Sequence, residues 1–279
     1  MMSYESCLTN GYLDETIIDW IPGMPPMSLG DVSSFVRTTD PDDFGLWFNI
    51  TEANNCTKAG ALIINTFDAL EADVLAALRA EYPRIYTVGP LGTLLCPPPH
   101  RAHPAQLAEF AWGVAAMGRP FLWVVREELV AGAPGGGPAA LPPEFLAETA
   151  GRRCVAAWCP QKRVLRHRAV GCFVTHNGWN STCEGVAAGV PMVCWPVFAD
   201  QYTNCKNACE VWGVGLRLDA EVRREQVAAH VGEAMASEEM RRNAARWKAE
   251  AEAAARPGGS SHENLLTLVK ALSTLKPEP

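Results

Sequence analysis

The stretch CFVTHNGWNSTCEGVAA, residues 172–188, decides the fold. Its first four residues, 172–175, form an apolar run that predicts a buried strand, and residues 181–188 have helical composition with Asn180 or Ser181 as the helix cap. The turn between them is polar and contains a glycine. A strand, a short turn and a helix in a parallel sheet present backbone N–H groups and a helix dipole at the strand's carboxyl end. The stretch therefore predicts a phosphate site.

Further apolar runs and helical patterns alternate on both sides of this stretch. Strands are predicted at 61–64, 85–88, 121–125, 155–158, 191–195 and 214–218. Helices are predicted where apolar residues recur at helical spacing, over 107–114, 227–235 and 240–251, with a terminal helix over 261–276. Continuously apolar strands separated by helices indicate a parallel sheet covered on both faces. We therefore predict an α/β fold with doubly wound parallel sheets.

The composition of the chain excludes several classes of protein. Of its 279 residues 48% are apolar and 20% charged, with 24 basic against 31 acidic residues and a net charge of −7. Without a basic stripe carrying aromatic residues, nucleic-acid binding is not expected. The sequence has no apolar run near the ~20 residues that span a bilayer, and no signal-peptide core follows Met1. We expect a globular protein of the cytoplasm.

The ten cysteines are scattered and form no CxxC pair and no cluster with zinc-ligand spacing. Several of them lie inside apolar runs, such as Cys172 and Cys194. We interpret them as reduced, mostly buried thiols of a cytosolic protein. No metal site is expected.

Four polar side chains near the predicted phosphate site have suitable chemistry for a nucleotide. His176, at the strand's end, adds a hydrogen-bond donor, and Asn180 and Ser181 do likewise in the first turn of the helix. Glu184, one turn into the helix, is placed to accept hydrogen bonds from a ribose. From these residues alone we predict an α/β protein with a phosphate site, which many folds possess.

The spacing over a longer stretch narrows this prediction. The sequence WCPQ at 158–161, HNGWNS at 176–181 and DQ at 200–201 resembles the plant secondary product glycosyltransferase box, the donor-site signature of family 1 UDP-glycosyltransferases. The span from Trp158 to Gln201 has the box's own length. Flanking motifs are similar to the subgroup that includes cyanohydrin and small-alcohol glucosyltransferases. Taken singly, Trp158, Trp179 and Trp195 would be interpreted as core residues; only the joint spacing favours ligand contact.

The resemblance implies a GT-B fold and an inverting transfer of a hexose from UDP-glucose to a hydroxyl of a small plant metabolite. It implies no cofactor, no metal, a monomer, and a UDP-sugar and a small hydroxylated acceptor as partners. Its implied donor residues are Trp158 stacking on the uracil, Gln161 and Glu184 at the ribose, His176, Asn180 and Ser181 at the diphosphate, and Trp179, Asp200 and Gln201 at the sugar hydroxyls. A terminal glutamine in the box goes with glucose as the donor sugar.

The chain departs from the family pattern in two places. The family's general base is a histidine near the start of the N-terminal domain, oriented by an aspartate, and no histidine precedes His100 here. Residues 96–103 contain a proline run where the family has a strand and a Gly-Ser loop. We therefore expect residues 1–95 to be a remnant of an acceptor domain and 96–279 to be a mostly present, Rossmann-like UDP-sugar domain. No catalytic residue is assigned, and a truncated, catalytically impaired product is predicted.

Two other hypotheses remain open from the sequence. A non-catalytic nucleotide-sugar-binding protein, or truncated pseudoenzyme product, is favoured by the absent base. A nicotinamide-dependent oxidoreductase would require GxGxxG after the first strand, with an acidic residue ~20 residues later. That arrangement is not present in the sequence.

Overall fold

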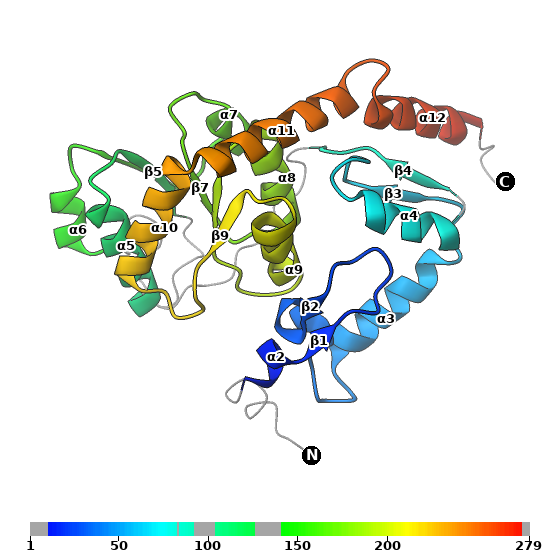
Figure 1. Cartoon of the computed structure of the whole chain (residues 1–279), viewed down its shortest axis with the longest axis horizontal. Coiled ribbons are helices and arrows are strands. Elements are labelled where there is room, and N and C mark those ends of the chain that lie inside the picture. Colours follow the sequence, from blue (N-terminus) through cyan, green and yellow to red (C-terminus); the bar gives the residue numbers. More distant parts are fainter. Residues whose placement is uncertain (1–10, 83, 92–103, 126–140, 275–279) are drawn as a thin grey trace.

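The computed structural model describes residues 11–82, 84–91, 104–125 and 141–274. The proline run at 96–103, with its His100, lies outside the described residues. Figure 1 shows an N-terminal group of elements beside a larger group that begins with α5. The elements of the N-terminal group are α2 (Tyr12–Glu15), β1 (Ile17–Ile18), β2 (Met27–Ser28), η1 (Leu29–Asp31), η2 (Ser34–Val36), α3 (Phe44–Cys56), β3 (Leu62–Ile64), α4 (Ala72–Glu81) and β4 (Ile85–Thr87).

The larger group alternates strands and helices before ending in three longer helices. Its elements are α5 (Pro104–Ala116), β5 (Phe121–Val124), α6 (Pro143–Glu148), β6 (Arg153–Ala156), α7 (Gln161–Leu165), β7 (Phe173–Thr175), α8 (Trp179–Ala188), β8 (Met192–Cys194), α9 (Gln201–Lys206), the π-helical η5 (Asn207–Val211), β9 (Gly215–Arg217), α10 (Arg224–Ala236), α11 (Glu238–Ala255) and α12 (Ser260–Thr274). This alternation confirms the predicted α/β class.

The sheets of the α/β units are parallel. β3 pairs with β4, β5 pairs with β6, and β8 lies between β7 and β9. In the three-stranded sheet Thr175 is opposite Cys194, and Cys194 is opposite Arg217. The sequence did not predict the short antiparallel pair β1 and β2, because each strand has only two residues. All seven predicted strands are present, with bounds that differ by up to two residues.

One of these differences changes the position of a candidate site residue. The strand predicted at 155–158 is β6, Arg153–Ala156, because its pairing with β5 ends at Val124 opposite Ala156. Trp158 consequently lies beyond the strand, in the connection to α7, and is 68% exposed. The parallel ladder, and not the apolar run, sets where the strand ends.

The start of α8 also differs from the prediction. The helix begins at Trp179, and Gly178 occupies the N-cap position without a side-chain cap, so neither Asn180 nor Ser181 caps it. The preceding Asn177 has φ of 62°, a left-handed conformation that asparagine tolerates better than most residues. The N-cap residue of α8 therefore supplies no side chain to accept hydrogen bonds from the first N–H groups of the helix.

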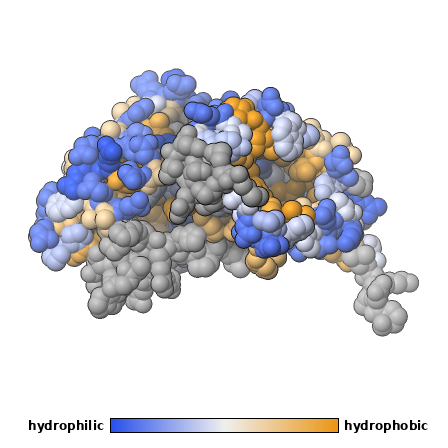
Figure 2. All heavy atoms as spheres, turned by 90° about the horizontal axis from the view of Figure 1, so that it is seen from below, coloured by the Kyte–Doolittle hydropathy of each residue, from blue (hydrophilic) through white to orange (hydrophobic). Residues whose placement is uncertain are grey.

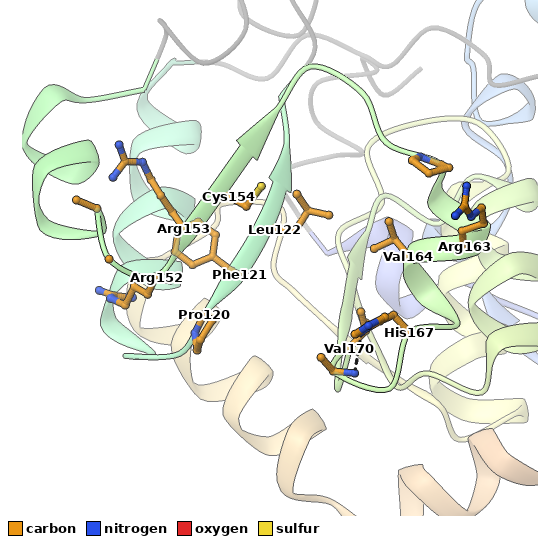
Figure 3. Close-up of a pocket in the computed structure, with 14 residues that line it drawn as sticks. Pro120, Phe121, Leu122, Arg152, Arg153, Cys154, Arg163, Val164, His167 and Val170 are labelled. Carbon is orange, nitrogen blue, oxygen red and sulfur yellow. Dashed lines mark hydrogen bonds between the residues drawn. The ribbon is translucent and has the colours of Figure 1, made fainter.

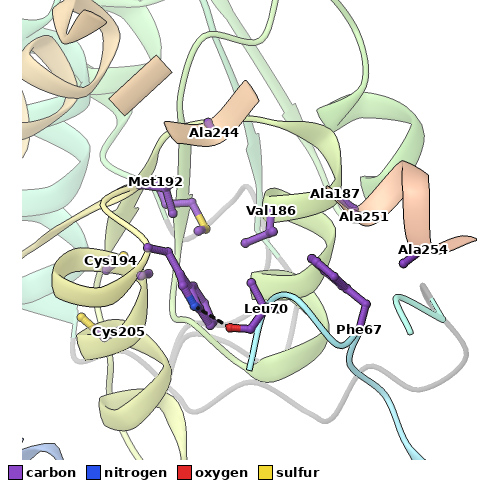
Figure 4. Packing of buried hydrophobic residues seen from close by; sticks show 13 residues of the cluster. Phe67, Leu70, Val186, Ala187, Met192, Cys194, Cys205, Ala244, Ala251 and Ala254 are labelled. Atoms are coloured by element: carbon purple, nitrogen blue, oxygen red, sulfur yellow. Dashed lines mark hydrogen bonds between the residues drawn. The ribbon is translucent and has the colours of Figure 1, made fainter. Parts of the chain in front are cut away.

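The largest hydrophobic cluster joins the two groups of elements. Figure 4 shows Phe67 and Leu70, which follow β3, packed with Val186 of α8 and Met192 of β8. The buried indole of Trp212 donates a hydrogen bond to the backbone oxygen of Leu70 at 3.2 Å. The end of the predicted remnant thus shares a core with the predicted donor domain. The boundary at residue 95 stays a prediction.

The terminal helix returns across the molecule, as Figure 1 shows for α12 beside β4. Asn264 donates to the hydroxyl oxygen of Thr87 at 2.8 Å and to its backbone oxygen at 3.2 Å. The helix, predicted over 261–276, begins one residue earlier, and Thr274 is its last described residue. These contacts hold α12 against the N-terminal sheet.

Apolar side chains remain on the surface, and Figure 2 shows apolar patches among the polar ones on one face. Trp20, Phe44 and Trp47 are 75%, 82% and 54% exposed. Of the eight cysteines in the described residues, three are buried and three half-buried, whereas Cys56 and Cys154 are exposed. In the described part of the chain, no helix has the length and apolarity needed to cross a membrane.

Candidate functional site

The turn between β7 and α8 brings His176 against the start of the helix. A Cβ built on Gly178 would lie 2.6 Å from Nε2 of His176, so only glycine fits this position without displacing the ring. The backbone N–H of Asn177 donates to Oγ1 of Thr175 at 3.1 Å, which holds the turn. The imidazole is therefore fixed at the carboxyl end of β7, beside the N-terminus of α8.

The N-terminus of α8 has the features of an anion site. An α-helix leaves its first N–H groups without intrahelical acceptors, and its dipole adds roughly half a positive charge there. The first intrahelical bond, from the N–H of Thr182 to the oxygen of Gly178, is 3.0 Å. Because the N-cap glycine supplies no side-chain oxygen, an anion can take that place.

Three expected donor residues form one hydrogen-bonded set. Nε2 of Gln161, the first residue of α7, donates to Oε2 of Glu184 at 2.9 Å and to Oγ of Ser181 at 3.1 Å. Glu184 and Ser181 are buried in α8 and 5% and 8% exposed. The amide thus ties α7 to α8 and orients the carboxylate of Glu184. The sequence placed these residues at one site, and the structure brings them together.

The two expected tryptophans have different surroundings. The ring of Trp158 is exposed and can therefore stack on a planar ligand. A tryptophan of the hydrophobic core would instead be covered by neighbouring side chains. The indole N–H of Trp179 donates to the backbone oxygen of Asn65 at 2.7 Å, and its ring lies 6.3 Å from that of Trp212. The side chain of Trp179 therefore serves the packing between α8 and the N-terminal elements.

Asn65 is a residue that sequence reasoning did not assign. Its Nδ2 donates to Oδ1 of Asn180 at 3.1 Å, and its Oδ1 accepts from the N–H of Leu91 at 2.8 Å. Together with the bond from Trp179, these contacts place Asn65 between β3, β4 and the first turn of α8. Its position directly after a strand was the available signal, since carboxyl ends of parallel strands carry sites.

Asp200 and Gln201 begin α9 at the carboxyl end of β8. Oε1 of Gln201 accepts from the N–H groups of Val197 and Phe198 at 2.9 and 3.2 Å. This leaves the amide nitrogen of the buried Gln201 as its remaining donor group for a ligand. The glutamine oxygen therefore shapes the loop, while Asp200 beside it is exposed.

Asn204 connects the two turns of the site. Its Nδ2 donates to the backbone oxygen of Asn177 at 2.9 Å and to Oδ2 of Asp200 at 2.8 Å. Asn204 is 6% exposed and was not predicted as a site residue. Because one amide group bridges both turns, the positions of His176 and Asp200 are coupled.

The N-terminal elements support the α9 loop from the other side. The backbone N–H of Ala199, which has φ of 57°, donates to Oγ of Ser34 at 2.7 Å. Oγ1 of Thr203 donates to the backbone oxygen of Asp31 at 2.7 Å. A non-glycine residue in this left-handed region is strained, so outside contacts must hold it.

A buried carboxylate anchors this support. Asp31 accepts from Arg217 at 2.7 Å and from Oγ of Ser28 at 2.9 Å, and Lys206 lies 3.7 Å away. Burial pushes the pKa of Asp31 upward. The hydrogen bonds from Ser28 and Arg217, with the charges of Arg217 and Lys206, outweigh burial and hold that pKa below its ordinary value.

Of two hollows in the described surface, the larger does not coincide with the expected site, whereas the smaller includes one of the expected residues. The larger, of about 710 Å³, lies between β5 with β6 and the α7 region, and Figure 3 shows Leu122, Arg153 and Val170 in its wall. None of the nine expected donor residues lines it. A smaller hollow of about 120 Å³ has Glu184, Lys162 and Arg166 in its wall. The expected residues lie at the strands' carboxyl ends, whereas the larger hollow includes residues at the strands' amino ends.

The fold also gathers cysteines that the sequence kept apart. The Sγ atoms of Cys194, Cys205 and Cys209 all lie within 4.8 Å of one another. Cys194 is 11 positions before Cys205, which is 4 positions before Cys209; the sequence contains no CxxC pair, and for that reason no metal site was expected. The parallel sheet brings the end of β8 against α9 and so makes the cluster.

Comparison with known families identifies one that matches most of the chain. The family model described as "UDP-glucoronosyl and UDP-glucosyl transferase" matches residues 58–248. That range includes all nine expected donor residues and also Asn65.

Curated relatives match over nearly the whole chain. The chain is 43% identical to 7-deoxyloganetin glucosyltransferase of Gardenia jasminoides, in an alignment that covers 96% of this chain and 63% of the relative. It is 42% identical to (R)-mandelonitrile beta-glucosyltransferase of Prunus dulcis, over 93% and 62%. The chain thus spans less than two thirds of these relatives' length. The first alignment covers 309 positions, more than the 279 residues of the chain, so the relative has internal positions without a counterpart here.

Solved structures are similar over the same extent. A UDP-glucosyltransferase from Polygonum tinctorium capable of glucosylating indoxyl has a TM-score of 0.80 and 29% identity, over 98% of this chain and 67% of that one. UGT2 of Phytolacca americana, complexed with UDP-2fluoro-glucose and pterostilbene, has a TM-score of 0.80 and 27% identity, over 97% and 67%.

Proposed function

This chain belongs to the UDP-glucoronosyl and UDP-glucosyl transferase family, and from that premise we propose that it carries the donor-binding part of an enzyme that transfers glucose from UDP-glucose to a hydroxyl of a small molecule. The architecture is α/β with parallel sheets of GT-B type, like that of the structural neighbours. UDP-glucose is a substrate, and members of this family need no cofactor for the transfer. The acceptor and the residues that contact the donor are part of the proposal.

The observation that carries the proposal is the set formed by Gln161, Ser181 and Glu184. One amide nitrogen bonds both α8 side chains, so the carboxylate of Glu184 is held in a single orientation. A carboxylate accepts hydrogen bonds only, which suits the two hydroxyls of a ribose. With the exposed ring of Trp158 at the head of α7, a uridine has both a stacking face and an acceptor for its sugar.

The diphosphate is proposed to lie at the N-terminus of α8, beside His176. As the bond from the anomeric carbon to the phosphate oxygen breaks, negative charge grows on the departing UDP. Fixed N–H dipoles and the adjacent imidazole stabilise that charge without reorganising during the reaction. Asn180 and Ser181 contribute from the first turn, where Asn65 and Gln161 hold their side chains.

The hexose is proposed to lie toward Asp200 and Gln201. Asp200 is exposed and accepts hydrogen bonds, while the amide nitrogen of Gln201 donates one. The backbone at Trp179, and not its engaged indole nitrogen, is the part of that residue directed to the sugar in this proposal. Opposed donor and acceptor groups suit the ring hydroxyls of glucose.

Acceptors of the relatives suggest the chemical class of acceptor for this chain. The relatives' names include a mandelonitrile and 7-deoxyloganetin, which indicates compact alcohols. Inverting transfer needs a base that removes the hydroxyl proton as the oxygen attacks the anomeric carbon, and such a base contributes about 10²–10⁴-fold. His176 is the first histidine among the described residues at a strand's carboxyl end, but our proposal assigns it to the diphosphate. Location in the cytosol and a monomeric state stay predictions.

The donor site is tested by calorimetry with UDP, UDP-glucose and ADP-glucose. We expect uridine compounds to bind more tightly, and Trp158→Ala to lower their affinity by roughly 5- to 150-fold, since base stacking contributes about 1–3 kcal/mol. Trp20→Ala, an exposed tryptophan outside the site, is the matched control and should leave affinity unchanged. Equal affinity for uridine and adenine nucleotides would contradict the proposal.

A binding protein without transferase activity is the second candidate. It would use the same set of Gln161, Ser181 and Glu184, which offers a ribose its hydrogen bonds without the help of any base. We expect the 279-residue polypeptide alone to bind UDP-glucose and to form no glucoside with a panel of small alcohols. Glucoside formation by this polypeptide would instead require a base among its own residues. Loss of that activity in His176→Ala, with UDP binding retained, would identify the base as His176.

A further inference from the structure

Three sulfur atoms converge next to the proposed sugar site. Cys194 is the last residue of β8, Cys205 lies in α9, and Cys209 lies in the π-helical η5. The sulfurs of Cys205 and Cys209 are 4.0 Å apart, and all three Sγ atoms are within 4.8 Å of each other. Figure 4 shows Cys194 and Cys205 at one end of the hydrophobic cluster.

The local backbone is arranged to leave room for these sulfurs. Cys205 and Cys209 are four residues apart on one helical face. The wider turn is closed by the bond from the N–H of Trp212 to the oxygen of Asn207 at 2.8 Å. A Cβ on Gly215 would lie 2.9 Å from Sγ of Cys194 and 3.1 Å from Sγ of Cys209. Glycine on β9 therefore keeps open the space that the sulfurs occupy.

We propose that Cys194, Cys205 and Cys209 form a three-thiolate site for one soft metal ion of the Cu⁺ and Zn²⁺ class. Thiolates are the preferred ligands of these ions. An ion ~2.3 Å from each of three sulfurs in trigonal geometry holds them about 4.0 Å apart. The Sγ atoms of Cys205 and Cys209 are 4.0 Å apart, which equals that value. Since all three Sγ atoms lie within 4.8 Å of one another, Cys194 needs to move by less than about 1 Å to bind the same ion.

The charge of the cluster also suits a cation. Hydrogen bonds from the thiols of Cys194 and Cys209 lower the pKa of Cys205 to about 4. The positive charge of Arg217 also lowers this pKa, whereas burial and the negative charge of Asp31 raise it. Hydrogen bonding to Cys205, with burial, raises the pKa of Cys194 well above its ordinary value.

Metal binding to this cluster is a proton exchange. Each cluster thiol that binds the ion loses its proton to solvent, and three metal–sulfur bonds form without any change in sulfur oxidation state. The affinity should therefore rise with pH. Arg217 remains as a counter-charge to the resulting anionic complex, and Asp31, Lys206 and Glu210 are the other charged groups nearest on the adjoining elements.

An occupied site would join β8 to α9 and η5. Gln201 is the first residue of α9 and Cys205 is one turn further along the same helix. The ion would fix the helix that presents Asp200 and Gln201. This consequence depends on the proposed function, but metal binding itself does not.

The test uses the whole polypeptide in reduced form, with the exposed Cys56 and Cys154 replaced by serine, and Cys7 and Cys96 likewise, so that fewer competing thiols remain. Cd²⁺ serves as the probe because its bonds to thiolates absorb in the ultraviolet, and Zn²⁺ and Cu⁺ are then added as competitors. We expect one ion per chain, release of protons on binding, and displacement by both competitors.

Cys205→Ser in this background should lower Cd²⁺ affinity by more than about 100-fold, since even outer-shell changes at metal sites cost 10–100-fold. Cys183→Ser, another buried cysteine outside the cluster, is the matched control and should keep the thiolate band. If Cys205→Ser fails to fold by circular dichroism, Cys209→Ser, at a half-buried position, replaces it. An undiminished band in these variants, or no thiolate band in the folded parent protein, overturns the proposal.

Discussion

The indole N–H of Trp179 donates a 2.7 Å hydrogen bond to the backbone oxygen of Asn65, a residue 114 positions earlier in the chain. Trp179 is the first residue of α8, and Asn65 follows β3. The N-terminus of the helix proposed to bind the diphosphate is therefore held by the N-terminal elements. The proposed donor site therefore depends on both groups of elements, and not on the later group alone.

The first prediction concerns Asn65, whose amide donates to Asn180 and whose oxygen accepts from Leu91. Asn65→Ala should lower the free energy of unfolding by about 1–3 kcal/mol, because it leaves polar partners unsatisfied. Urea unfolding measures the loss. Asn54→Ala, in the exposed face of α3, is the control and should change stability little. An unaffected midpoint in Asn65→Ala would show that the link carries no stability.

The second prediction tests the left-handed turn at Asn177. Asn177→Val should destabilise the protein by about 1–3 kcal/mol or more, because a β-branched residue is strained at φ of 62°. Asn177→Gly should be much better tolerated, since glycine adopts this conformation freely. Urea unfolding compares the two variants. Equal losses would mean that side-chain burial, and not backbone conformation, selects asparagine here.

The third prediction concerns pH and Asp31, whose folded-state pKa lies below its ordinary value. A depressed pKa contributes stability above the unfolded-state pKa of about 3.9, and this contribution is lost as the pH falls through the folded-state pKa. Asp31→Asn should cost about 1.5–3 kcal/mol at pH 7, where hydrogen bonds to charged groups are lost.

The stability difference between the parent protein and Asp31→Asn should shrink as the pH falls below about 4. Denaturant unfolding across this pH range measures it. Asp19→Asn, at an exposed position, serves as the matched control. A difference that stays constant with pH would contradict an ionised Asp31 in the folded protein.

The fourth prediction concerns Gln201 and the donor sugar. Gln201→Glu keeps an oxygen to accept from Val197 and Phe198 but loses the amide donor, so the loop should persist while the preference for UDP-glucose weakens. Gln201→His should narrow or reverse the preference for UDP-glucose over UDP-galactose. Calorimetry with both UDP-sugars measures the preference, with UDP alone as the control ligand. If the ratio of the two affinities is unchanged in both variants, Gln201 does not contact the sugar.

Much of the fold followed from local patterns. Short apolar runs predicted the strands, and helical periodicity predicted the long helices. Both patterns arise because the buried face of an element requires apolar residues at regular positions along the sequence. The ends of elements were less accurate. Trp158 lies outside the strand predicted for it because the pairing of β6 with β5 ends at Ala156. The N-cap of α8 is Gly178, and not Asn180 or Ser181, because the helix starts directly after the turn in which Asn177 has a left-handed conformation.

The candidate site was predictable where its residues are close in sequence. The family resemblance implied Gln161 and Glu184 at the ribose and Ser181 at the diphosphate of one donor site, and these three side chains form one hydrogen-bonded set. Asn65 and Asn204 were missed, since each acts on residues from another element through a single amide. The sequence also could not show that the indole nitrogen of Trp179 is engaged in packing.

By itself the sequence determined the α/β class, the parallel strands and the motif from Trp158 to Gln201, because these are properties of adjacent residues. Only the tertiary structure decided which sulfurs meet, since Cys194 and Cys205 are brought together by the contact of β8 with α9. The tertiary structure also decided that Asp31, near the start of the chain, supports α9. Asp31 accepts a hydrogen bond from Thr203 and forms an ion pair with Lys206, and both of these residues belong to α9. Such contacts depend on how elements pack in space, and the distance between two residues along the chain contains no record of that packing.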